Sequence, residues 1–330
     1  MKTRAIRKNM KSILAGVLAA CALAFVKPAV SFAAYSYPNA TKYTSGDAVI
    51  KKTVRNLDVD WVSGTVAVEY QNGSTVELHE SAKKAIPKDM QMRWWLDGDT
   101  LRVRFAKPGF HALSVREKNL TILLPEDSVF GEVSISATSG DLQIPELKTD
   151  SLKLTVSSGD INAAAEARTA QVNASSGDLD LQFGGKAKEI NVKTSSGEIE
   201  LAAETAERLA AKSSSGEIEV RAKKVDEFTA EASSGDISAE IGSVKQAALS
   251  TTSGRVEIAF DRFDALTISS TSGDVRAELP EKPGFTAEMK ATSGDIRYDL
   301  PLTKEGKTYV CGDGSGSLSI STTSGDITLR

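Results

Sequence analysis

The sequence is poor in cysteine, histidine and aromatic residues. Of its 330 residues, two are Cys, two are His and 6% are aromatic. Cys21 lies in an N-terminal apolar run, so Cys311 is left alone and cannot form an internal disulfide. His79 and His111 have no Cys or His partner at the spacing of a zinc site, and no nucleophile elbow accompanies them. These absences disfavour a disulfide-stabilised fold, a zinc protein and a Ser-His-Asp hydrolase.

The first 33 residues have the pattern of a secretory signal peptide. A basic segment precedes the apolar residues 13–26, and Ser31-Phe32-Ala33 fits a small-x-small cleavage site. We therefore expect export, an extracellular or envelope location, and cleavage near Ala33. Two alternatives stay open. One is an uncleaved N-terminal membrane anchor, although 14 apolar residues are short for a span. The other is lipidation at Cys21, within the lipobox-like residues 18–21.

Without this segment the chain is acidic. Removing residues 1–33 removes six basic residues and no acidic ones, which leaves 34 basic and 44 acidic residues and a net charge of −10. Nucleic-acid binding needs a basic surface that neutralises phosphates. The charge balance therefore argues against a nucleic-acid partner.

One phrase, Ser/Thr-Ser-Gly-Asp/Glu followed by Ile, Leu or Val, recurs along residues 131–330. Successive turn glycines are 18 to 21 residues apart, except for a last interval of 31. A fixed period near 20 residues is typical of a solenoid. The ten turn glycines are Gly140, Gly159, Gly177, Gly197, Gly216, Gly235, Gly254, Gly273, Gly294 and Gly325.

Apolar residues alternate with polar ones on both sides of each glycine. Ile218 and Val220 follow Gly216 at two and four residues, and Leu209 and Ala211 precede it at seven and five. This alternation predicts half-buried strands joined by a turn in which glycine supplies a positive φ. Stacked coils would then pair every strand with its neighbours. The sequence predicts an all-β fold, a parallel β-solenoid with coils of about 19 residues. Residues 201–212 are rich in helix formers, and we expect a wide turn there, with one helical turn.

Residues 34–130 lack the phrase but are also rich in β-formers. Residues 62–68, with Gly64, resemble a degenerate copy of the repeat. We interpret residues 34–130 as irregular N-terminal coils and a cap whose core includes Trp94, Trp95 and Phe105. Residues 131–330 are then the regular solenoid, with a mobile loop inserted at about 300–317.

Together, the signal peptide, the irregular N-terminal part, the lead-in LTILLP and the SSGDI-type coils resemble the bacterial putative-adhesin domain family, seen also in LiaG-like cell-envelope proteins. The resemblance covers the whole mature chain. It implies a single-stranded right-handed parallel β-helix outside the membrane, with an adhesive or envelope-associated role. It brings no catalytic residues, because the shared motif is a structural turn.

Acidic residues form two columns on the expected outer surface. Asp178, Glu198, Glu217 and Asp236 follow successive turn glycines, and Asp180, Glu200 and Glu219 lie two residues further on. Carboxylates in neighbouring coils would lie about 5 Å apart and repel one another. Two interpretations are possible: each carboxylate accepts backbone N–H bonds in the turn, or Ca²⁺ bridges the columns.

Three classes of function remain for a fold of this kind. The first is a non-catalytic adhesin or binding protein whose partner is a cell-wall polymer, a host matrix or an envelope protein. The second is a structural or signalling accessory of the envelope without adhesive activity. The third is a polysaccharide-active enzyme with Glu200 and Glu219 as acid and nucleophile, which the identical carboxylates of every coil disfavour.

Two further expectations concern association between molecules. Cys311 is a candidate thiol for cross-linking two copies. The sequence stops at residue 330 inside a repeat strand, and an uncovered last coil would offer open backbone donors and acceptors. We therefore expect this last coil to support end-to-end self-association.

Overall fold

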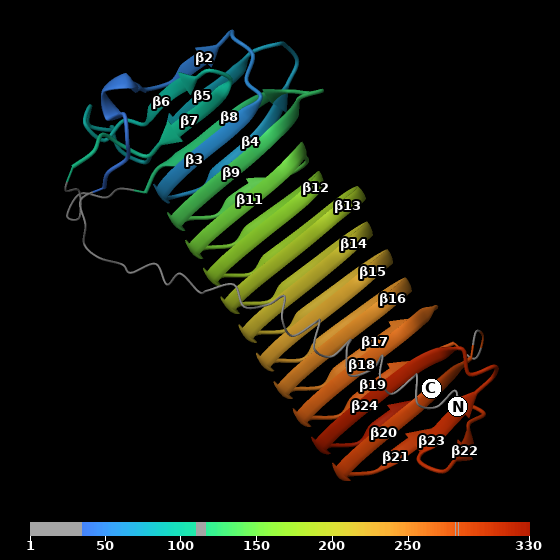
Figure 1. The fold of residues 1–330 in the computed structure, drawn as a ribbon. Coiled ribbons are helices and arrows are strands. Elements are labelled where there is room, and N and C mark those ends of the chain that lie inside the picture. Colours follow the sequence, from blue (N-terminus) through green and yellow to red (C-terminus); the bar gives the residue numbers. More distant parts are fainter. Residues whose placement is uncertain (1–34, 110–116, 281, 283) are drawn as a thin grey trace.

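The computed structural model describes residues 35–109, 117–280, 282 and 284–330. The expected signal peptide, including Cys21, lies outside these residues, as does His111. Figure 1 shows a long stack of strands with a broader cap at one end. Within the described ranges, no helix has the length and apolar character needed to span a membrane.

The cap contains one short 3₁₀ helix and the first eight strands. They are η1 (Ala40–Lys42), β1 (Thr44–Ser45), β2 (Ala48–Ile50), β3 (Asn56–Ser63), β4 (Val66–Gln71), β5 (Val76–Ser81), β6 (Arg93–Asp97), β7 (Thr100–Arg104) and β8 (Asn119–Pro125).

The remaining strands form the stack and its far end. They are β9 (Val129–Ser139), β10 (Leu142–Ile144), β11 (Lys148–Ser158), β12 (Ile161–Ser176), β13 (Leu179–Ser196), β14 (Ile199–Ser215), β15 (Ile218–Ser234), β16 (Ile237–Ser253), β17 (Val256–Phe260), β18 (Phe263–Ser272), β19 (Val275–Glu278), β20 (Phe285–Ser293), β21 (Ile296–Tyr298), β22 (Thr303–Glu305), β23 (Thr308–Cys311), β24 (Gly316–Ser324) and β25 (Ile327–Leu329).

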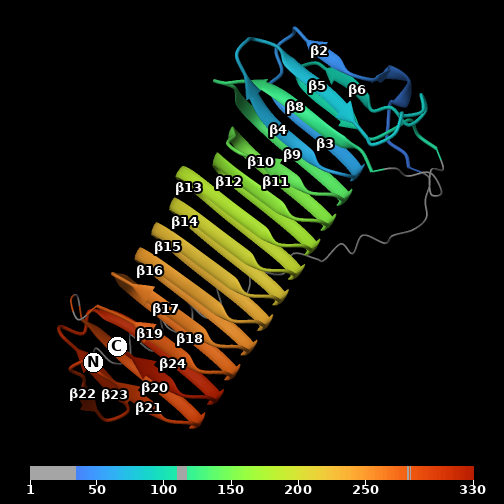
Figure 2. The same cartoon turned by 180° about the vertical axis from the view of Figure 1, so that it is seen from behind.

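The stack confirms the predicted all-β solenoid. Strands β11 to β16 pair in parallel and in register, so that equivalent residues of successive repeats are direct neighbours. Ile218, for example, lies between Ile199 and Ile237 and is fully buried. The regular spacing of these strands is visible from both sides (Figure 2). Apolar residues of every coil meet in one continuous core, as the alternation predicts.

The helical turn expected within residues 201–212 is wrong. Strand β14 runs through this segment, and Thr205 and Leu209 pair with Lys224 and Phe228 of β15. Alanine, glutamate and arginine favour a helix only weakly, by tenths of a kcal/mol each. Ladders on both sides of the strand, together with burial of Leu209, outweigh that preference.

At the cap, the order of coils in space differs from their order in the sequence. The coil of β3 and β4 lies between the coil of β7 and β8 and the coil of β9 and β10. Gly64 of the degenerate copy stacks on Gly140, in line with the turn glycines. Outside this outermost coil, β6 pairs antiparallel with β7, and β5 pairs antiparallel with β8. The antiparallel strands therefore cover the edge that the outermost coil would otherwise expose.

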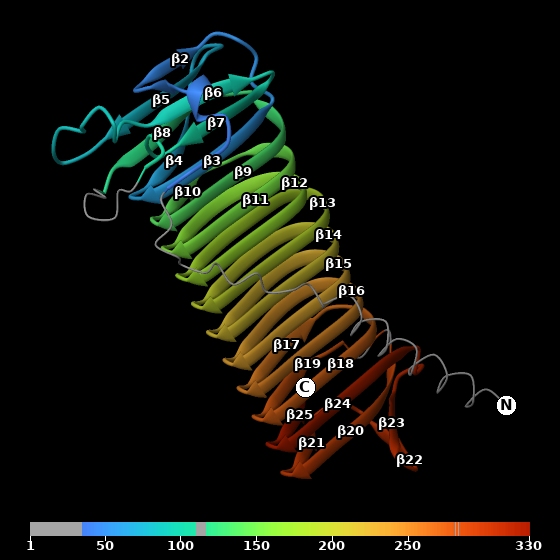
Figure 3. The same ribbon diagram turned by 60° about the vertical axis from the view of Figure 1, so that its left-hand side comes forward.

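A similar reordering occurs at the far end (Figure 3). The last segment of the sequence, β24 and β25, inserts between β18–β19 and β20–β21 and pairs in parallel with both. The expectation that the C-terminal strand forms an uncovered last coil is therefore wrong. The outermost coil consists of β20 and β21, because the long 31-residue interval lets the chain pass outward and return.

The segment expected to be a mobile loop contains a β-hairpin. Strands β22 and β23 pair with each other, and β23 also pairs antiparallel with Phe285–Ala287 of β20. Cys311, at the end of β23, is fully buried. Its thiol is therefore not positioned to cross-link two copies, contrary to the expectation from sequence.

Candidate functional site on the solenoid surface

The turns of successive coils stack into a column along the rod. Each turn has the sequence Ser-Gly followed by an acidic residue in nearly every coil. The N–H of the turn glycine donates to the carbonyl of the serine in the next coil, as from Gly197 to Ser215 at 3.2 Å. The hydrogen bonding between coils therefore continues through the turn.

Glycine is required in this column for a reason beyond its backbone angle. Gly216 has a φ of 150°, a region that favours glycine. A Cβ at Gly216 would also lie 2.0 Å from the carbonyl oxygen of Gly197, and one at Gly235 would lie 2.1 Å from that of Gly216. The close approach of stacked turns thus excludes any side chain.

The aspartates that follow these glycines cap the neighbouring coil. Asp178 Oδ1 accepts the N–H of Glu198 at 2.9 Å. At the cap, Asn119 Oδ1 accepts the N–H of Thr65 at 3.0 Å in the same way. A short side chain therefore satisfies an N–H of the next turn. The same bond joins Asp141 to Asp160, Asp160 to Asp178, Asp236 to Arg255, Asp274 to Asp326 and Asp326 to Asp295.

The glutamates of this column behave differently. In the described part of the chain, neither Glu198 nor Glu217 makes the capping bond. Burial raises the pKa of Glu217, and the nearby carboxylates of Glu198, Asp236 and Glu219 raise it further. The middle of the column is therefore a site of like-charge repulsion.

Arginine relieves the repulsion in the second column. Arg221 lies between Glu200 and Glu219: its Nη1 is 3.2 Å from Glu200 Oε1, and its Nη2 pairs with Glu219. Asp180 accepts a hydrogen bond from Asn162 at 3.2 Å. No set of three or more His, Cys, Asp or Glu side chains within the described ranges is arranged to hold a metal ion. The calcium hypothesis therefore stays a prediction for experiment.

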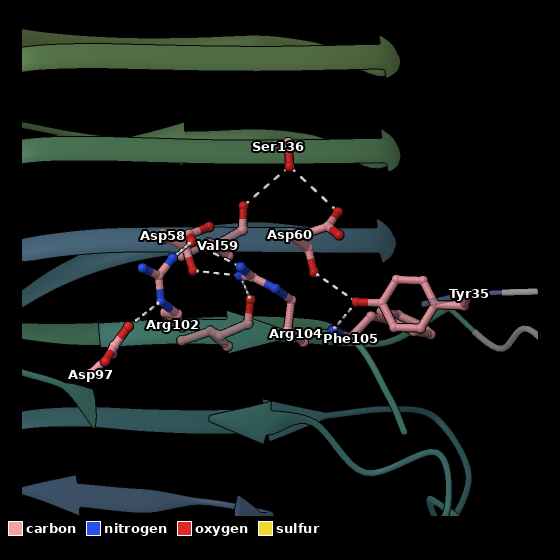
Figure 4. Close-up of polar contacts among 10 residues, drawn as sticks. Tyr35, Asp58, Val59, Asp60, Asp97, Arg102, Arg104, Phe105 and Ser136 are labelled. Carbon is pink, nitrogen blue, oxygen red and sulfur yellow. Dashed lines mark hydrogen bonds and ion pairs between the residues drawn. The ribbon is translucent and has the colours of Figure 1, made fainter. Parts of the chain in front are cut away.

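A polar cluster that was not predicted from the sequence lies in the cap (Figure 4). Asp58 and Asp60 of β3 face Arg102 and Arg104 of β7 across the parallel ladder. Arg104 Nη2 is 2.8 Å from Asp58 Oδ2, and Arg102 pairs with the same carboxylate. The Asp-x-Asp and Arg-x-Arg spacing is the signal in the sequence that could have indicated this pairing.

Burial sets the electrostatics of this cluster. It raises the pKa of Asp60, an effect that Arg104 opposes, and Asp60 Oδ1 accepts a hydrogen bond from Ser136 at 3.4 Å. The Tyr35 hydroxyl donates to the carbonyl of Asp60 at 3.3 Å and accepts the N–H of Phe105 at 2.9 Å. Carboxylates of β3 thus already pair with both arginines, and the hydrogen bonds of Tyr35 attach it to the first coils.

A second buried ion pair holds the inside of the cap. Lys118 is 2% exposed, and its Nζ donates to Glu80 Oε2 at 2.8 Å, to Met90 O at 2.6 Å and to Phe105 O. Burial lowers the pKa of Lys118, and Glu80 opposes that shift. All three ammonium protons have acceptors, so Lys118 cross-links three segments of the cap.

The other residues noted in the sequence do not form a catalytic site. His79 is partly exposed between Asp47 and Glu77, at 3.5 and 3.3 Å. Phe105 is buried against Trp61 as expected, whereas Trp95 contacts Tyr43 and Lys42 outside the core.

Two hollows in the surface of the described residues are lined by residues outside the acidic columns. One, of about 260 Å³, is lined by Ser81, Ala82, Lys83, Glu117, Lys118 and Asn119. Another, of about 210 Å³, is lined by Tyr70, Glu126, Ser128, Glu146 and Lys148. Neither contains a residue of the two acidic columns.

Comparisons with known proteins bear on the family and on the fold. The model of the family Toastrack DUF4097 matches residues 54–265 and 240–330. Among solved structures, a proposed cell adhesion protein of Clostridium sporogenes is 13% identical, with 87% of this chain and 99% of that chain covered and a TM-score of 0.19. A proposed adhesin of Bacteroides fragilis is 12% identical, with coverage of 86% and 96% and a TM-score of 0.33.

A proposed adhesin of Parabacteroides distasonis is 14% identical, with coverage of 88% and 97% and a TM-score of 0.41. With TM-scores below 0.5, these three likenesses say nothing of what this chain binds. No curated protein matches the chain.

Proposed function

The chain belongs to the Toastrack DUF4097 family, and we propose that it is a non-catalytic, exported β-solenoid that binds a repetitive cell-wall polymer along its side. The expected signal peptide supports export. The proposal for a binding surface depends on one observation, the in-register column of hydroxyls described next.

This hydroxyl column is formed by the Ser or Thr two residues before each turn glycine. Its side chains are half-exposed or exposed in every coil. The serines that follow them, such as Ser196, Ser215 and Ser234, pair directly from coil to coil. The column comprises Thr138, Ser157, Ser175, Ser195, Ser214, Ser233, Thr252, Thr271, Thr323 and Thr292.

Regular spacing makes such a column suited to a polymer. Neighbouring coils are about 4.8 Å apart, so hydroxyl groups recur at a constant short interval. Each contact would be weak, but a polymer that meets several coils binds with the summed affinity of all of them. Hydroxyls donate and accept hydrogen bonds, as the sugars of a wall polymer do.

Catalysis is not part of the proposal because the two candidate carboxylates pair with the same cation. Glu200 and Glu219 share the same Arg221, whereas an acid and a nucleophile need environments that separate their pKa values.

Co-sedimentation of residues 34–330 with isolated cell-wall sacculi tests the proposal. We expect saturable pelleting that is lost when Ser195, Ser214 and Ser233 are replaced by glutamine. A matched control carries glutamine at Glu200, Glu219 and Ser238, which lie in the same three coils on the strand that follows each turn. This control should pellet as the wild type does.

Each protein is tested with calcium and with chelator, because these conditions separate the hypotheses. Pelleting that needs calcium and is lost in the control variant would instead assign binding to the acidic columns. No pelleting in any condition would refute polymer binding and favour an accessory role in the envelope. Turnover of a polysaccharide that depends on Glu200 and Glu219 would establish the enzyme alternative.

A further inference from the structure

The two ends of the solenoid are covered to different extents. At the cap, β6 and β5 pair with five residues each of β7 and β8, so both strands of the outermost coil are covered. At the far end, β23 covers only residues 285–287 of β20. No described strand pairs with the outer side of residues 288–293 or of β21. The outermost coil is therefore covered along both strands at the cap, whereas at the far end, the open end, most of β20 and all of β21 lack a described strand on the outer side.

Main-chain groups at the open end point outward. In each preceding coil, the turn glycine donates its N–H to a serine carbonyl one coil further on, and the last such bond runs from Gly325 to Ser293. Within the described part of the chain, Gly294 has no following coil to donate to. The N–H of Gly316 donates to the carbonyl of Gly284, which directs the main-chain groups of the even-numbered residues of β20 toward β24. Amide directions alternate along a strand, so the N–H groups of Met289 and Ala291 face the open end.

Core side chains are less buried in this coil than one coil inward. Ile320 and Thr322 are 1% and 3% exposed, whereas Met289 and Ala291 at the equivalent positions are only half-buried. In β21, Tyr298 is 41% exposed, whereas its neighbour Leu329 is fully buried. A further layer of strand would complete the core and the ladder together.

We propose that this open end is a dimer interface, at which β20 pairs antiparallel with β20 of a second copy about a two-fold axis. A head-to-tail arrangement is disfavoured, since the cap already covers its own edge with antiparallel strands. An isologous contact between two open ends closes on itself, so it gives a dimer and no filament. The interface therefore lies on residues 288–298, which follow the part of β20 that the β22–β23 hairpin covers. It does not lie on the strand that ends the sequence.

The free length of the edge and the charges on it select one register. β23 blocks residues 285–287, so pairing starts at Glu288. The side chains of two opposed residues in an antiparallel pair point to the same face of the sheet. The solvent-facing side chains of Glu288, Lys290 and Thr292 must therefore lie opposite solvent-facing side chains of the second copy. A register centred on Lys290 would place Lys290 of one copy opposite Lys290 of the other, and the two like charges would repel. One centred on Ala291 opposes Lys290 to Thr292 of the second copy and uses all of residues 288–294.

This register can be tested with two substitutions at one exposed position. Thr292→Glu would oppose Lys290 of the second copy with a carboxylate, and Thr292→Lys would oppose it with a like charge. We expect Thr292→Glu to tighten the dimer roughly 2- to 30-fold, the range for two cross-strand ion pairs, and Thr292→Lys to weaken it similarly. The measurement is sedimentation velocity of residues 34–330 over a range of concentrations.

Matched controls are Thr271→Glu and Thr271→Lys. Thr271 belongs to the same hydroxyl column but lies two coils inward, between paired strands on both sides. These variants should leave the association unchanged, and circular dichroism checks the folding of every variant. The charge-reversed double variant Lys290→Glu with Thr292→Lys should restore dimerisation.

Three results would overturn the proposal. The first is a monomer at every concentration for both the wild type and Thr292→Glu. The second is a shift in the same direction for Thr292→Glu and Thr292→Lys. The third is an equal shift for the Thr271 variants. Because the interface lies at the end of the rod, polymer binding can fail without affecting this result.

Discussion

Replacing Lys118 with methionine should destabilise the cap by about 3–5 kcal/mol, the cost of breaking a buried ion pair. Lys118 is 2% exposed, and its partner Glu80 has a side chain that is 5% exposed. The substitution would leave the Glu80 carboxylate buried without its cation. It would also remove the donor that satisfies the carbonyls of Met90 and Phe105.

The double variant Glu80→Gln with Lys118→Met provides the matched control. Glu80 Oε2 also accepts the N–H of Met92 at 2.9 Å, and an amide oxygen can keep this bond. With no charge left to compensate, most of the lost stability should return. With Glu80→Gln measured alone as well, the double-mutant cycle gives the coupling of Glu80 with Lys118.

The effect should be confined to one end of the molecule. A solenoid is stabilised mainly by contacts between neighbouring coils, so a defect in the cap need not spread along the rod. Hydrogen exchange should therefore rise in β3, β7 and β8 and stay unchanged in β14 and β15. A loss of less than 1 kcal/mol in urea unfolding of the cap, or a double variant as unstable as Lys118→Met alone, would refute the reasoning.

Three further predictions concern the turns and the far end. Asp178→Ala should lower the free energy of unfolding by about 0.5–1.5 kcal/mol because the N–H of Glu198 loses its acceptor. Asp178→Asn keeps an acceptor oxygen, so it should retain most of that stability in thermal unfolding. The raised pKa of Glu217 means that its charge destabilises the folded state above that pKa. Glu217→Gln should therefore raise the Tm at pH 7 and change nothing once acid protonates the glutamate. Deleting residues 316–330 should expose residues 284–298 to hydrogen exchange, and a peptide of the deleted sequence should restore protection.

The repeat carried most of the fold information. The period of about 19 residues predicts the coils, and the alternation around Gly216 predicts which side chains enter the core, because stacking makes every coil repeat the same environment. The sequence also identifies the glycine in each turn, but it predicts only the need for a positive φ there. The approach of the Gly197 carbonyl to Gly216 is a contact between coils, which a single repeat does not reveal.

What the sequence did not reveal depends on contacts between distant segments. The matching Asp-x-Asp and Arg-x-Arg patterns are compatible with a pairing of β3 with β7, but they do not establish it, because another hairpin could have lain between the two strands. Lys118 looks like an ordinary surface lysine in the sequence, and only its burial beside Glu80 makes it structural.

Local periodicity is enough to predict the β-solenoid, the turn column and the inward and outward faces of the strands. The order of coils at both ends depends on contacts between segments that are distant in the sequence. A chain that returns between two earlier coils has the same local pattern as one that continues outward. The insertion of β24 and β25, and with it the location of the open edge on β20, depends on which strand edges find partners, and that is a property of the assembled molecule.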